Sequence, residues 1–230
     1  MLRIKESLFI LLAATVLGYV IAFPVSSYQI WLKFFAVALG VLLINIAAKK
    51  LLAYKLGCEL EVKPWNIERY GFDRAQYFAW PLPAWLIWPV AVVWLSLGNV
   101  WWLVVSTFEV HATLRRVGRK FAEVTEWDIA LISAFGMVIN LIAAIVASAL
   151  GYQQIAFINL WFVFFNMLPF PAYDGGKIFF GGRIFWVFMF TLSLAVLVLL
   201  HVAANTLITV ITALIAAIIA AVLFYSLGKR

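Results

Sequence analysis

Five long apolar runs constrain this chain more than any other feature of its sequence. Runs of about 17–25 apolar residues are long enough to cross the hydrocarbon core of a bilayer as helices. The five runs are Ser7–Phe23, Ile30–Ala48, Ile129–Leu150, Ile184–Ala203 and Thr206–Leu227. Hydrophobic residues make up 67% of the 230 residues and charged residues 12%, against about 45–50% and about 25% in soluble domains. The sequence therefore predicts an all-α polytopic membrane protein and excludes a soluble enzyme.

Two further segments are apolar but interrupted. Ile155–Leu168 ends at a stretch rich in proline and glycine, which predicts a helix broken at membrane depth and brings the expected transmembrane helices to about six. Trp80–Phe108 contains three prolines and the break Ser96–Asn99, so it is either one tilted span or a re-entrant hairpin. Its tryptophans are typical of an anchoring belt at a membrane interface.

The positions of the basic residues favour the hairpin. With a hairpin, all but one of the 17 lysines and arginines lie on one face, and only Lys33 faces away. A full crossing would instead place the basic loop Arg115–Lys120 on the opposite face. Because lysine and arginine collect in cytoplasmic loops, the sequence predicts a multi-pass protein of the cell membrane with both termini in the cytoplasm. Orientation in the membrane thus explains the net charge of +7, and no nucleic-acid partner is expected.

The sequence contains no internal repeat and no long linker, so we expect a single membrane domain over residues 1–230. The first apolar run has an alternative interpretation as a cleaved signal peptide. Arg3 and Lys5 precede its apolar core, and small residues lie near Ala22. The distribution of basic residues fits a retained helix better.

The segment Asn166–Gly176 holds an acidic residue between apolar stretches. It reads Asn-Met-Leu-Pro-Phe-Pro-Ala-Tyr-Asp-Gly-Gly, and its prolines and glycines cannot continue a helix. Irregular backbone is tolerated at membrane depth only where protein or a wet cavity satisfies its polar groups. A carboxylate there is a functional candidate because its burial is unfavourable without a cation, which singles out Asp174. Alternatively, Asp174 only caps a helix that begins near Gly175.

The pattern Asn-x-x-Pro-x-Pro-x-x-Asp-Gly resembles the third motif of the site-2 protease family, which are intramembrane zinc metalloproteases. Gly136–Asn140 resembles the Gly-Pro-x-x-Asn motif of that family, with Met137 in place of the proline. The resemblance implies a protease-like core at about residues 30–186, with additional helices at 7–23, 184–203 and 206–227. It also implies that Asp174 corresponds to a zinc ligand, and that Asn166 and Asn140 contact substrate backbone. Asn166 could equally satisfy the end of the broken helix.

The family's other zinc ligands and its general base come from a His-Glu-x-x-His motif at the end of the second helix. This chain has Asn45, Ile46 and Lys49 at those three positions. Asparagine is a poor zinc ligand, isoleucine cannot accept a proton from water, and a lysine ammonium repels a divalent metal. His111 and His201 have no acidic or histidine partner at ligand spacing. We therefore predict no zinc, no other cofactor and no catalytic residue.

Lys49 has two interpretations. If the second helix continues through Lys49, then Asn45 and Lys49 share one helical face because they are four residues apart. The Lys49 ammonium would then lie near the family's zinc position and pair with Asp174, with Asn45 adding a hydrogen bond. Alternatively, Lys49 and Lys50 flank the membrane span and extend toward lipid headgroups.

These residues predict a catalytically inactive pseudoprotease that binds or scaffolds other membrane proteins. The expected partners are membrane lipids and a membrane protein or transmembrane peptide. One alternative is an active zinc metalloprotease whose site is altered or is completed by a partner. A transporter that uses Asp174 and Lys49 as a charge relay is disfavoured, because the chain has few other intramembrane charges and no repeat.

Overall fold

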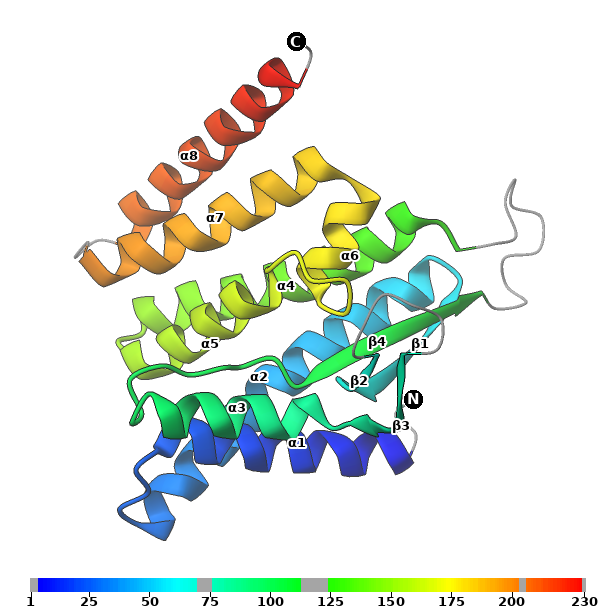
Figure 1. The fold of residues 1–230 in the computed structure, drawn as a ribbon. Helices are drawn as coiled ribbons and strands as arrows, with labels where there is room; N and C mark the ends of the chain where they lie inside the picture. Colours follow the sequence, from blue (N-terminus) through cyan, green and yellow to red (C-terminus); the bar gives the residue numbers. More distant parts are fainter. Residues whose placement is uncertain (1–3, 70–75, 113–123, 203–205, 229–230) are drawn as a thin grey trace. The chain divides into compact units, whose positions relative to one another are not determined.

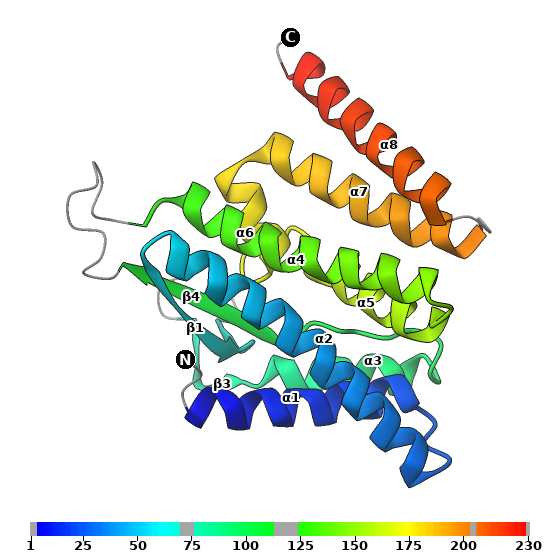
Figure 2. The ribbon, with the colours of Figure 1, turned by 180° about the vertical axis from the view of Figure 1, so that it is seen from behind.

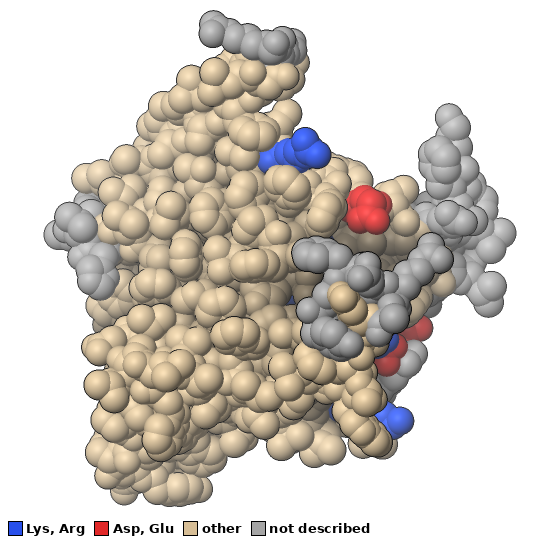
Figure 3. Space-filling view, in the orientation of Figure 1, with Lys and Arg blue, Asp and Glu red and all other residues tan. Residues whose placement is uncertain are grey.

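The computed structural model describes all residues except 1–3, 70–75, 113–123, 203–205 and 229–230 (Figure 1). It confirms an all-α polytopic membrane protein. In the described part, five helices have the length and apolarity to span a membrane, namely α1 (Ile4–Ala22), α2 (Tyr28–Lys55), α4 (Glu126–Ala149), α7 (Arg183–Val202) and α8 (Thr206–Leu227). In the view of Figure 3, most of the described surface carries no charged side chains.

The remaining helices are shorter. The predicted run Ile155–Leu168 forms α5 (Gln153–Asn166), which has 14 residues. An eight-residue helix, α6 (Asp174–Gly181), follows the proline-rich segment, so the predicted interruption of this helix is confirmed. The third short helix is α3 (Ala84–Leu95).

Contacts divide the chain into two compact units. Unit 1 comprises Met1–Leu42 and Glu61–Glu109, and unit 2 comprises Leu43–Leu60 and Val110–Arg230. Helix α2 therefore contributes its first part to unit 1 and its second part to unit 2. The organisation of residues 1–230 as a single membrane domain stays a prediction.

In unit 1, α1 is part of the packed structure. It packs against α3. The buried carboxylate of Glu6 accepts a hydrogen bond of 2.8 Å from the backbone N–H of Val62. A Cβ atom added at Gly18 would lie 2.8 Å from the backbone of Phe35, so α1 and α2 approach closely there. The interpretation of the first apolar run as a retained helix stays a prediction.

Trp80–Phe108 forms the predicted hairpin. Helix α3 has 12 residues and so a length of about 18 Å, which is too short to cross a hydrocarbon core of about 30 Å. The chain then turns at Gly98, whose φ is +83°. The N–H of Trp85 donates to the carbonyl of Trp65, whose own N–H donates to the carbonyl of Val105. The two ends of the segment therefore meet at Trp65.

Two small two-stranded sheets were not predicted. Strand β1 (Cys58–Pro64) pairs with β4 (Ser106–Ala112), and β2 (Ile67–Arg69) pairs antiparallel with β3 (Tyr77–Leu82). In β1 the buried residues alternate with the more exposed ones. This period of two is the pattern of a strand that buries one face.

In unit 2, the helices pack around α4. Helix α4 packs against α5 and α6, and α7 packs against α8. Figure 2 shows the end of α2 beside α4. A Cβ atom at Gly181 would overlap the side chain of Ala130 and the carbonyl of Glu126, so this glycine permits the close approach of α6 to α4.

The predicted orientation depends largely on residues outside the described part of the chain. These are Arg3, the loop Arg115–Lys120 and the pair Lys229–Arg230. The cytoplasmic position of both termini therefore stays a prediction.

Candidate functional site

Helix α2 carries the three residues that replace the His-Glu-x-x-His motif. The helix ends at Lys55, beyond the predicted end at Ala48, because the charged residues Lys49 and Lys50 interrupt the apolar run without ending the helix. Asn45, Ile46 and Lys49 are consequently helical, and all three are buried. The alternative in which Lys49 extends toward headgroups is wrong for this structure.

The proline-rich segment brings Asp174 back toward the helices of unit 2. Helix α5 ends at Asn166, and α6 begins at Asp174. A Cβ atom at Gly175 would overlap the carbonyl groups of Met167 and Leu168. Only a residue without a side chain permits this close return of the backbone. The return places Asp174 at the first position of α6.

Asp174 does not cap α6 in the way the alternative supposed. The N-cap residue of α6 is Tyr173, and no side chain makes a capping hydrogen bond there. A carboxylate in the first turn is still favourable, because the helix dipole is positive at that end. Capping therefore leaves the Asp174 carboxylate available for another partner.

That partner is Lys49. The Lys49 Nζ atom lies 2.7 Å from Asp174 Oδ2 and donates a hydrogen bond to it. Both side chains are buried. The ammonium neutralises a carboxylate that would otherwise be unstable away from water. The predicted pairing of these two residues is confirmed. The second oxygen, Asp174 Oδ1, is buried and accepts no hydrogen bond from the described residues.

Gly136 of α4 makes room for the lysine side chain. A Cβ atom added at Gly136 would lie 2.6 Å from Lys49 Cε and 2.8 Å from Lys49 Cγ. It would also lie 3.0 Å from Asn45 Nδ2. These distances are too short for non-bonded contact, so the aliphatic part of Lys49 crosses α4 over this glycine. The glycine of the Gly136–Asn140 motif thus has a direct role in the ion pair.

Three buried asparagines form a chain of hydrogen bonds through unit 2. Asn45 Nδ2 donates to Asn140 Oδ1 at 3.4 Å, and Asn140 Nδ2 donates to Asn159 Oδ1 at 3.3 Å. Asn159 Nδ2 then donates to the carbonyl of Ile155 at 3.0 Å. The prediction that Asn45 adds a hydrogen bond to the Lys49–Asp174 pair is therefore wrong, because its amide donates to Asn140 instead. Sequence reasoning missed Asn159, although an amide inside an apolar run is itself a signal.

Asn166 makes a local hydrogen bond. Its Nδ2 atom donates to the carbonyl of Phe162 at 2.8 Å, and the residue is buried. Asn166 thus satisfies a carbonyl group in the last turn of α5, as the structural alternative expected. A role of Asn166 and Asn140 in binding substrate backbone stays a prediction.

The residues around Asp174 do not fit a zinc ion. Zinc sites in proteins use histidine, cysteine and carboxylate ligands, with three protein ligands in catalytic sites. Within the described ranges, no group of three or more such residues is placed to hold a metal. His111 is exposed on β4, and the side chain of His201 lies outside the described part. A metal at Asp174 would also have to displace the Lys49 ammonium.

Comparisons of the chain with protein-family models, with curated proteins and with solved structures find no match. The resemblance to site-2 proteases therefore depends on the motif residues alone.

Proposed function

We propose that this chain is a catalytically inactive homologue of site-2 proteases that binds or scaffolds other membrane proteins. The observation that carries the proposal is the buried ion pair between Lys49 and Asp174. At the position where the family motif implies a metal, this chain supplies its own cation. The carboxylate is thereby neutralised without a bound ion.

The chemistry of these residues supports the absence of proteolysis. Metal-assisted hydrolysis needs a Lewis acid with an open position for water and a group that accepts a proton from that water. The Lys49 ammonium has no coordination position, and Ile46 has no proton acceptor. The buried asparagines donate and accept hydrogen bonds, which serves packing and binding.

A binding role accounts for what the substitutions retain. The chain retains the interrupted helix and Asp174, and Lys49 supplies a cation in place of the metal. The ion pair then stabilises the fold around the former zinc site, although the site has lost its reactivity. The proposed setting is the cell membrane, with both termini in the cytoplasm. The proposed partners are lipids and a membrane protein or transmembrane peptide.

Metal analysis of the purified protein tests the loss of catalysis. We expect substoichiometric zinc after purification in zinc-containing buffer, and no cleavage of a transmembrane peptide. Stoichiometric zinc together with cleavage that a chelator abolishes would overturn the proposal. The same result would favour the alternative of an active protease with an altered site. Repeating the assay in native membranes detects a site that a partner completes.

Photo-crosslinking tests the binding role separately. A photoreactive residue at Phe170 probes the loop before α6, and one at Leu223 of α8 is the control, since both side chains are more than half exposed. We expect a discrete membrane protein to crosslink at Phe170 and not at Leu223. Crosslinks to lipid alone at both positions would contradict a scaffold role for this loop.

A further inference from the structure

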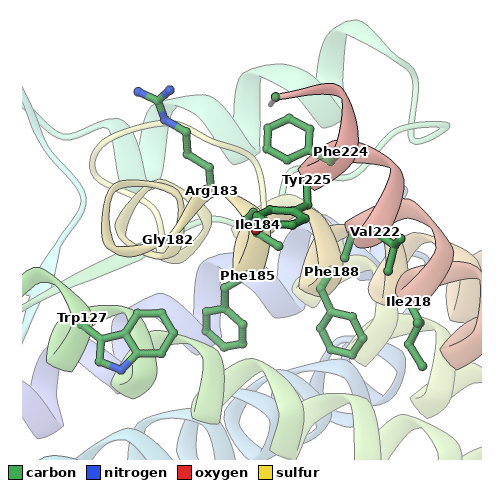
Figure 4. Close-up of a pocket in the computed structure, with 12 residues that line it drawn as sticks. Trp127, Gly182, Arg183, Ile184, Phe185, Phe188, Ile218, Val222, Phe224 and Tyr225 are labelled. Carbon is green, nitrogen blue, oxygen red and sulfur yellow. The ribbon is translucent and has the colours of Figure 1, made fainter. Parts of the chain in front are cut away.

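Unit 2 contains an apolar pocket whose lining residues do not include Lys49 or Asp174. It has a volume of about 870 Å³ and is bounded by α7, α8 and the first turn of α4. This volume falls within the range of about 300–1,000 Å³ that is usual for small-molecule sites. Figure 4 shows the rings and aliphatic side chains that line it, among them Trp127, Phe185, Phe188, Val222, Phe224 and Tyr225.

The edge of the pocket carries a positive charge. Arg183 is the charged residue among the described residues that line it. In Figure 4 its guanidinium points away from the rings of Trp127 and Phe185, and the side chain is exposed. Its guanidinium carbon lies 5.6 Å from the ring centroid of Phe179. The pocket is therefore apolar inside and cationic at its edge.

Helix α7 adds a second attraction for an anion at the same place. The helix begins at Arg183, and the N–H groups of a first helical turn have no carbonyl partner within their helix. Together with the helix dipole they favour a phosphate group at that end. Glu126 lies next to Trp127 in the sequence and is exposed, so the edge is not uniformly positive. Recognition of a single phosphate fits this arrangement better than recognition of a strongly anionic surface.

We propose that one membrane phospholipid inserts a hydrocarbon chain into this pocket and places its phosphate against Arg183 and the first turn of α7. Both α7 and α8 have the length and apolarity of membrane spans, so lipid is the solvent at their surface. An amphiphile matches both parts of the site. A partner helix without a carboxylate at this position would fill the apolar part but would not match the cation of Arg183.

Native mass spectrometry of the whole chain in detergent, titrated with phosphatidylglycerol, tests this proposal. Ala221 lines the pocket, so Ala221→Trp should fill it and abolish the tightest lipid adduct. Leu223→Trp is the matched control, because Leu223 is exposed on the same helix and does not line the pocket. This control should retain the adduct. Both variants are compared by thermal unfolding to show that they are folded.

Two further measurements address the phosphate. Arg183→Gln should weaken phosphatidylglycerol binding about tenfold, which corresponds to one charge-assisted hydrogen bond. Diacylglycerol, which has hydrocarbon chains but no phosphate, should bind more weakly and should be insensitive to Arg183→Gln. Equal binding of the two lipids would overturn the role of Arg183. An undiminished adduct in Ala221→Trp, or a lipid-independent dimer lost in that variant, would overturn the lipid site.

Discussion

The two units each contain a lysine–carboxylate pair, and the pairs differ in burial far more than in distance. In unit 2, Lys49 Nζ and Asp174 Oδ2 lie 2.7 Å apart, with side chains 7% and 6% exposed. In unit 1, Lys63 Nζ and Glu109 Oε2 lie 2.5 Å apart, with side chains 41% and 50% exposed. The shorter pair, Lys63–Glu109, is the one whose charges water can solvate. Distance alone therefore does not rank these interactions.

The difference lies in what remains when one partner is removed. Water solvates an exposed charge that loses its partner, so an exposed pair contributes little to stability. A buried charge that loses its partner stays desolvated, which is strongly destabilising. We therefore expect the Lys49–Asp174 pair to matter to the fold and the Lys63–Glu109 pair to matter little.

The largest expected effect follows from Lys49→Met. This variant removes the ammonium and leaves the Asp174 carboxylate buried without a cation, so the free energy of unfolding should fall by ~3–5 kcal/mol. Unfolding in mixed micelles measures the change. Lys63→Met in unit 1 is the matched control and should unfold almost as the unmodified protein does. Equal losses in the two variants would show that burial does not distinguish the pairs.

A double variant separates the lost charge pair from lost packing. In Lys49→Met with Asp174→Leu, no charge is left in the site, and replacing a buried ion pair with apolar residues is often neutral or stabilising. The double variant should therefore recover most of the stability lost in Lys49→Met. Additive losses would mean that the two residues act independently.

Gly136→Ala should have the second-largest effect. The new methyl group would displace the Lys49 side chain, although its ammonium is bound to Asp174. Overpacking of this kind lowers the free energy of unfolding by about 1–3 kcal/mol. Gly40 of α2 is the control, because a Cβ atom there meets nothing within 4 Å. Gly40→Ala should be slightly stabilising, since alanine favours helix over glycine. If Gly136→Ala is equally destabilising in a Lys49→Ala background, the lysine is not the group it displaces.

Asn159→Leu should have a smaller effect. It removes the acceptor of the Asn140 amide and the donor to Ile155. Side-chain hydrogen bonds between membrane helices contribute about 0.6 kcal/mol each on average and about 1.7 at most. We expect a loss of free energy of unfolding in this range, measured in the same micelles. A loss as large as that of Lys49→Met would indicate that the asparagines support the ion pair directly.

The smallest expected effect concerns pH and salt at the exposed pair. The hydrogen bond to Glu109 raises the pKa of Lys63 above its ordinary value of 10.5. The pair therefore contributes its full stabilisation below that value and loses it as the pH rises through the raised pKa. The difference between the unmodified protein and Lys63→Met should thus vanish at high pH, and salt should shrink it. A difference that persists in strong alkali would contradict the assignment to this pair.

Sequence patterns predict the elements that depend on local composition. The five apolar runs form long helices with small shifts at their ends, and the prolines and glycines after Asn166 mark the break between α5 and α6. The predicted end of α2 is too early because Lys49, Lys50 and Lys55 are polar. Strand β1 was not predicted, although Cys58, Leu60 and Val62 alternate with charged residues. Such alternation is itself a signal of a half-buried strand.

The site is less accessible to sequence reasoning because its residues are far apart in the chain. Lys49 and Asp174 are separated by 125 positions, and only the resemblance to a family places them together. Spacing shows that Asn45 and Lys49 share a helical face, but it cannot show that Gly136 lies under Lys49. The pocket between α7 and α8 depends on how two apolar helices pack, which their composition does not specify.

The separation of Lys49 from Asp174 along the sequence has a consequence for synthesis of the protein at the ribosome. Chains grow at about 5–20 residues per second, so roughly 6–25 seconds pass between synthesis of Lys49 and synthesis of its carboxylate, 125 residues later. During that interval Lys49 cannot form its ion pair with Asp174. Six positions from the end of the helix, this lysine can reach the headgroups by extending its side chain. The ion pair can form only after α6 has been synthesised, so a chain that stops before Asp174 lacks it.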